Sequence, residues 1–178
     1  MKRTCNAILT ALAGGMLVVA ASNATAQTVE VPGLSDDVTV FTDANGIPTI
    51  VGETETDVIF VKGYLHARDR FFQMDFLRRV PSGTLSELVG SSALANDIEL
   101  RTLGLRRGAF ASWVVLNDEE KAWLKAYSDG VNHYLNNNPL PPEYSALEIT
   151  QAEPWLPVDS LVIGKLLAFQ LSFDLEIG

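Results

Sequence analysis

The sequence contains a single cysteine, Cys5, which lies close to the start of the chain. One thiol forms no internal disulfide and supplies too few ligands for a cysteine-rich zinc site. Histidine is almost as scarce, because His66 and His133 are the only two in 178 residues. Neither lies in a spacing typical of a zinc protease or a catalytic triad, so we expect both to be surface or packing residues.

Glycine-rich phosphate-binding loops are also missing. The only adjacent glycines, Gly14 and Gly15, have no Walker or Rossmann spacing around them. The sequence has no EF-hand loop, internal repeat, low-complexity tract or linker. These absences exclude a nucleotide-binding domain of either kind and favour one undivided domain.

Basic residues are outnumbered by acidic ones, 13 to 22, which gives a net charge of −9 at pH 7. An acidic surface repels nucleic acid and anionic membrane, so neither is expected as a partner. The hydrophobic content of 47% and the charged content of 20% are typical of a folded globular protein rather than a disordered one.

The beginning of the chain has the pattern of a secretory signal peptide. A basic start, an apolar run over residues 7–21 and the cleavage-type sequence Ala-Thr-Ala at residues 24–26 follow one another. The apolar run is shorter than the roughly 20 residues of a membrane-spanning helix, so no membrane span is expected. We therefore predict a signal peptide over residues 1–26, one domain over residues 27–178, and a periplasmic or secreted location.

The strongest helical pattern of the chain surrounds residues 62–79. Apolar side chains fall there in two neighbouring rows, which predicts a helix packed deep in a larger body. The rows are Phe60, Tyr64, Ala67, Phe71 and Met74, and beside them Val58, Val61, Leu65, Phe72 and Phe76. Charged residues lie between the rows, so some charges must reach the buried margin and need partners there. We expect them to pair internally or with neighbouring segments such as that of Glu87, and we expect Arg68→Leu to damage folding or assembly.

The overall pattern predicts an α+β fold that is mostly helical and carries an N-terminal β-hairpin. Residues 27–37 are expected to be an irregular lead-in. Asn45 and Gly46 mark the turn of the hairpin, because this dipeptide readily adopts positive φ. Pro48 in the second strand favours an edge position, since proline donates no backbone hydrogen bond to a neighbouring strand.

The rest of the chain is predicted to be helical. The long helix is expected to end near Val80, at Pro81 and Gly83, and a short helical turn follows over residues 82–90. A helical region over residues 91–115 is expected to be broken or softened at Gly104 and Gly108. Two further helices are expected to start at Asn117 and at Pro157. Residues 161–171 are almost continuously apolar, so we expect the final helix to be buried on most sides. Such burial favours surroundings that are supplied elsewhere, and the alternative is a helix packed within this unit alone.

These residues by themselves predict no self-contained active site. Asp69 and Asp75 are of the type that a glycoside hydrolase uses, but their separation places them on different faces of a helix. We expect both to form structural ion pairs with Arg68, Arg70, Arg78 or Arg79. For Asp174 and Glu176 two alternatives stay open, a solvated tail and a calcium site shared with another chain.

Five segments resemble, in the same order, those of one family. They are residues 40–50 (VFTDANGIPTI), 63–75 (GYLHARDRFFQMD), 83–90 (GTLSELVG), 127–132 (YSDGVN), and Pro154 and Trp155 with Asp159. The chain thereby resembles the α subunit of the penicillin acylase and acyl-homoserine lactone acylase family, which are secreted N-terminal nucleophile hydrolases. The resemblance covers nearly all of residues 38–173, and the helix segment is its most specific part.

The resemblance implies a precursor that is cleaved into an α and a β subunit, which together form an αββα heterodimer. A serine that cleavage exposes as the first residue of the β subunit would attack the amide of a small N-acyl substrate, with its own α-amine as the base. The substrate would be a β-lactam or an acyl-homoserine lactone. The resemblance implies no organic cofactor, but it does imply a calcium ion at the α/β interface. This chain would then hold no catalytic residue, and we expect it to be inactive without the β subunit.

The same resemblance places part of the acyl pocket on the final helix. By position it implies the substrate-binding residues Ala168, Phe169, Ser172 and Phe173, and the calcium ligand Glu176. A second hypothesis stays open, that of a non-catalytic secreted interaction or scaffold domain that has kept the α-subunit pattern. A third, an unrelated hydrolase using Asp69 and Asp75, is disfavoured by their helical placement.

Overall fold

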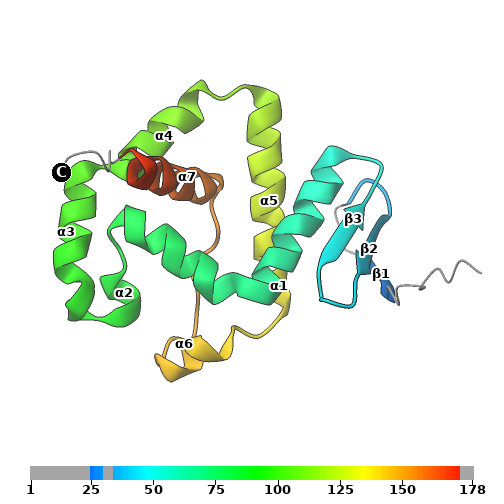
Figure 1. Ribbon diagram of the computed structural model, residues 1–178, viewed down its shortest axis with the longest axis horizontal. Helices are drawn as coiled ribbons and strands as arrows, with labels where there is room; N and C mark the ends of the chain where they lie inside the picture. The colour runs from blue at the N-terminus through cyan, green and yellow to red at the C-terminus, as the bar shows by residue number, and fades with distance from the viewer. Residues whose placement is uncertain (1–24, 30–33, 173–178) are drawn as a thin grey trace, which may run out of the picture.

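The computed structural model describes residues 25–29 and 34–172, and this part of the chain is mostly helical with one small sheet (Figure 1). The strands are β1 (Thr25–Val29), β2 (Val38–Thr42) and β3 (Pro48–Val51). The helices are α1 (Glu55–Ser82), α2 (Ser86–Val89), the 3₁₀ turn η1 (Ser91–Ala93), α3 (Leu94–Leu103), α4 (Leu105–Val115), α5 (Asp118–Asn137), α6 (Pro142–Ala146) and α7 (Pro157–Leu171). The predicted mostly helical α+β class is confirmed.

The sheet is antiparallel and has the strand order β1-β2-β3. Its second turn is organised by Asp43, whose carboxylate accepts the backbone N–H of Asn45 at 2.9 Å and that of Ile47 at 2.8 Å. Gly46 in this turn has a φ of 79°, which favours glycine. The predicted hairpin is therefore confirmed, and Pro48 lies on an edge strand as expected.

β1 is an element that the sequence pattern did not predict. We expected residues 27–37 to be irregular, but residues 27–29 pair with residues 38–40 of β2. A strand at a sheet edge depends on the partner strand that it meets, and so short a segment carries little local signal of its own. β1 also spans the predicted cleavage bond after Ala26, while residues 1–24 lie outside the described residues.

α1 ends close to the predicted signals, Pro81 and Gly83, but is not straight. The hydroxyl of Thr54 caps its start by accepting the N–H of Asp57 at 3.2 Å. Gly83 follows its end with a φ of 66°, while Pro81 lies inside the last turn rather than ending the helix. Arg70, with φ −147° and ψ 23°, kinks the helix in its middle, and Figure 1 shows the change of direction.

The two halves of α1 pack against different parts of the fold. Val61 and Leu65 in the first half form a buried cluster with β2. Phe71 in the second half stacks on Tyr144 with a centroid separation of 5.9 Å and belongs to the main core together with Trp155. The deep packing predicted for this helix is thus confirmed.

α1 and α5 cross at a point where each helix contributes a glycine. A Cβ atom on Gly63 would overlap the carbonyl of Tyr127, and a Cβ atom on Gly130 would overlap the carbonyl of Phe60. The two backbones can approach this closely only because neither glycine has a side chain.

The remaining helix boundaries follow local signals, with one exception. Gly104 has a φ of 78° and separates α3 from α4, as predicted. Gly108 lies within α4, so the softening expected there is wrong. α5 starts with a capping box, in which Asn117 accepts the N–H of Glu120 at 2.8 Å and its own N–H donates to the Glu120 carboxylate at 2.9 Å.

α7 is buried on one side only. Val158 and Val162 face the core and are 4% and 0% exposed, whereas Leu167 and Leu171 are 56% and 76% exposed. The expected burial on most sides is therefore wrong for the described residues, because no segment among them covers the second side of this helix. No helix in the described part of the chain has both the length and the apolar character that crossing a bilayer requires.

Candidate functional site

A buried cluster of charged side chains holds the start of α7 against α1 and α4. At its centre the carboxylate of Asp159 accepts hydrogen bonds from Arg78 Nη1 and Arg106 Nη1, both at 2.9 Å. It also accepts the backbone N–H of Leu156 at 2.8 Å, which caps the helix. The Asp159 side chain is 3% exposed, so this carboxylate joins three helices and does not face solvent.

The guanidinium of Arg78 connects α1 to the segment before α7. It donates to the carbonyl of Glu153 at 2.7 Å, to the carbonyl of Pro154 at 2.8 Å and to the carboxylate of Asp75 at 2.7 Å. It also lies 5.1 Å from the ring centroid of Trp155. One side chain thereby fixes the position of the polypeptide that leads into α7.

The carboxylate of Asp75 extends the cluster to α6 and α2. It accepts the hydroxyl of Tyr144 at 2.7 Å and Nε of Arg79 at 3.0 Å, and Arg79 Nη1 is 2.9 Å from the carboxylate of Glu87. Burial and the hydrogen bond to Asp75 raise the pKa of Tyr144. Because the Asp75 side chain is 0% exposed, it is structural and cannot reach a substrate.

The ion pairs predicted for the long helix are confirmed. Asp75 pairs with Arg78 and Arg79, and Asp69 pairs with Arg68 at 2.7 Å on the surface. A hydrolase that uses Asp69 and Asp75 together is incompatible with this arrangement.

Sequence reasoning missed Asp159, Arg106 and Tyr144 as members of the cluster. These residues meet Arg78 and Asp75 only after the chain has folded, since Tyr144 is 69 positions from Asp75 and Asp159 is 81 from Arg78. The one local signal was Asp159 in the first turn of the final helix, where an acidic residue favours helix formation.

Three of the four predicted substrate-binding residues lie at the end of α7. Ala168 and Ser172 are exposed and Phe169 is half-buried. The hydroxyl of Ser172 donates to the carbonyl of Phe169 at 2.7 Å. Phe173, the fourth, lies outside the described residues. Their contact with an acyl chain stays a prediction.

The predicted calcium ligand, Glu176, lies outside the described residues, as does Asp174. Among residues 25–29 and 34–172, no group of three or more histidine, cysteine, aspartate and glutamate side chains is arranged to hold a metal ion. The calcium site therefore stays a prediction about the segment after α7.

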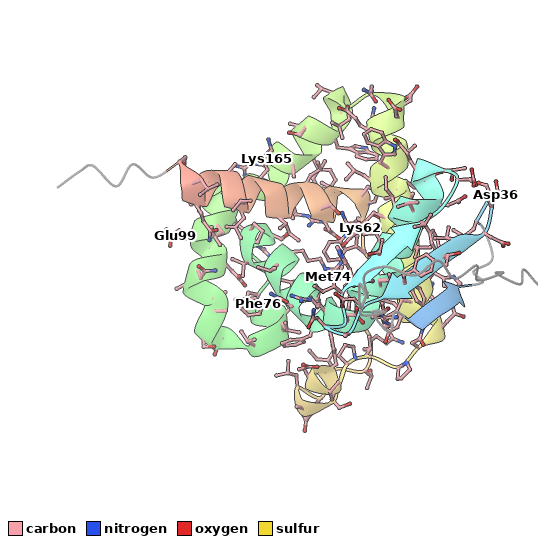
Figure 2. The ribbon with its side chains drawn as sticks, turned by 45° about the vertical axis from the view of Figure 1, so that its right-hand side comes forward. Asp36, Lys62, Met74, Phe76, Glu99 and Lys165 are labelled. Atoms are coloured by element: carbon pink, nitrogen blue, oxygen red, sulfur yellow. The ribbon has the colours of Figure 1, made fainter. Side chains whose placement is uncertain are left out.

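A largely apolar groove of about 550 Å³ lies between α1, α5 and α7, and we call it the α1/α5/α7 groove. Its apolar lining includes Ile59, Met74, Leu77, Trp123, Leu161 and Ile163. Figure 2 shows Lys62 and Met74 in the middle of the molecule, on the other side of α7 from Lys165. The groove is open to solvent, and most of its lining is apolar.

The two histidines have packing roles. His66 Nδ1 lies 2.9 Å from the hydroxyl of Tyr127, which joins α1 to α5 at the edge of the groove. His133 packs beside the rings of Phe60 and Tyr64, with centroid separations of 5.9 and 6.1 Å. The expectation that both are surface or packing residues agrees with these contacts.

We expect the stability of the chain to fall as the pH is lowered below 6.5, partly through His66. Burial, together with the positive charges of Lys62 and Arg70, lowers the pKa of His66 from its ordinary value of 6.5, against an opposing effect of Asp69. The imidazole of the unfolded chain therefore binds a proton at a higher pH than that of the folded chain. His66 costs no stability above pH 6.5, and it destabilises the fold as the pH falls from 6.5 to the lowered pKa of His66 in the folded state. The effect is small because the side chain is partly exposed.

Urea unfolding between pH 5 and 7.5 measures this dependence. The variant His66→Gln keeps a polar side chain that does not titrate, so its unfolding free energy should change less over the same range. An equally steep decline in both proteins would contradict the role of His66.

The sequence and the fold both match known acylases. The family model for penicillin amidase matches residues 37–177. The chain is 39% identical over 140 residues to penicillin acylase 2 proenzyme of Pseudomonas sp. (strain SE83), which covers 78% of this chain and 18% of that protein. It is 36% identical over 151 residues to the acyl-homoserine lactone acylase QuiP of Pseudomonas syringae pv. tomato, covering 84% of this chain and 18% of the relative. The chain thus spans about a fifth of the length of these relatives.

A solved structure has a similar fold. One chain of a thermostable penicillin G acylase from Alcaligenes faecalis, in a tetragonal form, superposes with a TM-score of 0.70 at 28% identity. The match covers 79% of this chain and 77% of that chain. Since the two fractions are nearly equal, the two chains are of about the same length.

Proposed function

Because this chain belongs to the penicillin amidase family, we propose that it is the α-subunit part of a secreted acylase. The enzyme hydrolyses the amide bond between an acyl side chain and a β-lactam nucleus or a homoserine lactone. The names of the relatives support these two substrate classes, because one is a penicillin acylase and another an acyl-homoserine lactone acylase.

A contrast in length carries this proposal. The matched segment is 18% of the penicillin acylase 2 proenzyme, yet it is 77% of one chain in the solved penicillin G acylase. This contrast supports a segment that is made within a long precursor and then becomes a separate chain. The word proenzyme in the name of the relative fits the same order of events.

The catalytic serine belongs, in this proposal, to a β subunit derived from the same precursor. Its hydroxyl oxygen attacks the amide carbonyl, its proton passes to the serine's own α-amine and then to the leaving amine, and an acyl ester remains on the serine. Water cleaves the ester and releases the carboxylic acid. Asp75 and Asp159 take no part, since both are buried in ion pairs.

The role of this chain is to position one wall of the acyl pocket. The cluster around Arg78 and Asp159 fixes the start of α7, and the far end of the same helix carries Ala168, Phe169 and Ser172. α7 has fifteen residues and contains both Asp159 near its start and Ala168 and Phe169 near its end. Removal of the signal peptide over residues 1–26 and a periplasmic or secreted location complete the proposal.

The proposal is tested by expressing the chain alone and together with the rest of its own precursor. We expect no hydrolysis of penicillins or acyl-homoserine lactones by the chain alone, and hydrolysis of at least one class by the complete protein. Mass spectrometry should find a serine as the first residue of the second chain, and replacing that serine by alanine should abolish turnover.

Two results would contradict the proposal. The first is hydrolysis by the purified chain without a second subunit. The second is a chain that is a stable monomer in the cell and is not accompanied by a downstream subunit, which would favour the non-catalytic scaffold.

A further inference from the structure

The α1/α5/α7 groove is lined by buried residues at its base and by exposed residues at its opening. Trp155 lies among its lining residues and is only 2% exposed. Leu77, which also lines the groove, is 38% exposed. Contact with water is unfavourable for the apolar side chains around this opening, and a second surface that covered them would remove this cost.

The apolar surface continues from the groove along α7. Ile163 lines the groove, and Leu167 and Leu171 follow it at intervals of four residues, which places all three on one side of the helix. Leu167 and Leu171 are 56% and 76% exposed. The surface therefore extends well beyond a pocket for one small molecule.

One cation in the groove has no anionic partner among the described residues. Lys62 lines the groove, and no described carboxylate lies within 4.0 Å of its ammonium group. The carboxylate in the lining, that of Glu120, is held by the backbone N–H of Asn117 at 2.9 Å. A surface that covered the groove would desolvate the Lys62 ammonium group, and a carboxylate on that surface would offset the cost.

We infer that the α1/α5/α7 groove binds a second polypeptide, the one that corresponds to the part of the relatives that this chain does not match. This polypeptide presents apolar side chains to the groove, together with an acidic residue that pairs with Lys62. The inference rests on the proposed function and names the surface by which this chain meets its β subunit. The relatives supply the occupant, because 82% of the penicillin acylase 2 proenzyme lies outside the 18% that this chain covers.

A second copy of this chain fits the groove less well. A symmetric dimer would place the same patch on both partners, so the groove-lining carboxylate that a second copy brings is that of Glu120. This carboxylate already accepts the backbone N–H of Asn117 at 2.9 Å, so it is less available to Lys62 than an unpaired acidic side chain.

The test is an affinity measurement between this chain and the rest of its own precursor, co-expressed and then titrated as purified parts at physiological salt. We expect Leu77→Glu and Lys62→Glu each to weaken the complex about tenfold or more, because each introduces a carboxylate into the apolar contact or opposite an acidic partner.

Two control variants have matched chemistry outside the groove. Leu147 is 37% exposed, against 38% for Leu77, so Leu147→Glu makes the same change at the same exposure. Lys165 is not among the residues that line the groove, so Lys165→Glu reverses the same charge outside it. Both controls should bind like the unmodified chain. The melting temperature of each free variant shows whether it has folded.

The outcomes separate this inference from the proposed function. An active complex that tolerates Leu77→Glu and Lys62→Glu overturns the groove inference and leaves the acylase proposal intact. The absence of any complex with the unmodified chain overturns both. A dimer of the chain alone that Leu77→Glu dissociates assigns the groove to a second copy and overturns the inference as well.

Discussion

Replacing Arg78 by leucine is expected to lower the free energy of unfolding by about 3–5 kcal/mol. The guanidinium is the shared partner of Asp75 and Asp159, whose side chains are 0% and 3% exposed. Leucine would leave two buried carboxylates with fewer counter-charges and the carbonyls of Glu153 and Pro154 without a donor. Since a domain has only about 5–15 kcal/mol of stability in total, a large part of it depends on this side chain.

Urea unfolding of the isolated chain, followed by circular dichroism, measures the loss. The matched control is Arg68→Leu, in which the same residue type is replaced ten positions earlier on the same helix. Arg68 and Asp69 have 36% and 43% exposed side chains, so their ion pair contributes at most about 1 kcal/mol. Equal losses in the two variants would contradict the central role of Arg78.

The contacts of Arg68 and Arg78 also change what we expect of Arg68→Leu. From the helical pattern we predicted that Arg68→Leu would damage folding or assembly. Among the described residues, Arg68 forms an ion pair with its exposed neighbour Asp69. Arg78, in contrast, connects α1 to α4, α7 and the segment before α7 through Asp159 and two backbone carbonyls. We therefore expect the replacement of Arg78, rather than that of Arg68, to destabilise the fold.

Replacing Gly63 by alanine is expected to destabilise the chain by about 2–3 kcal/mol. The new methyl group would overlap the carbonyl of Tyr127 on α5, and a helix backbone cannot yield as the end of a flexible side chain can. The two helices would have to separate, which also disturbs the reciprocal contact between Gly130 and the carbonyl of Phe60. This cost exceeds the gain of about 1 kcal/mol that alanine brings to a helix interior.

Thermal unfolding separates the two effects when Gly108→Ala is measured beside Gly63→Ala. Gly108 also lies inside a helix, but a Cβ atom there meets no atom within 4 Å. Helix propensity alone then applies, and Gly108→Ala should be neutral or stabilising by up to about 1 kcal/mol. If Gly63→Ala behaved in the same way, the close approach of α1 and α5 would not be a constraint on the fold.

Local signals in the sequence predicted most of the element boundaries. The turn at Gly46, the end of α1 at Gly83 and the break at Gly104 each need positive φ, which glycine adopts without strain. Asn117 predicted the start of α5 because its side chain can cap the first turn. These features depend on a few neighbouring residues, so a local reading is sufficient for them.

The candidate site was less predictable, because its residues come from separate parts of the chain. The pattern of α1 indicated that Asp75 would pair with an arginine of the same helix, but not that Asp159, Arg106 and Tyr144 would complete the cluster. The final helix was predicted as apolar, and the described fold covers only one of its sides. β1 was missed because its pairing depends on β2 rather than on its own residues.

The sequence by itself determined the class of the fold and the charges that need partners, because turn residues, helix caps and hydrophobic periodicity act over a few positions. The family followed from five segments that resemble, in order, those of the penicillin acylases. Only the tertiary structure decided which charges meet, how closely α1 and α5 approach, and which side of α7 remains open. Those outcomes depend on contacts between residues far apart in the chain, and the geometry of such contacts is set by packing rather than by any local pattern.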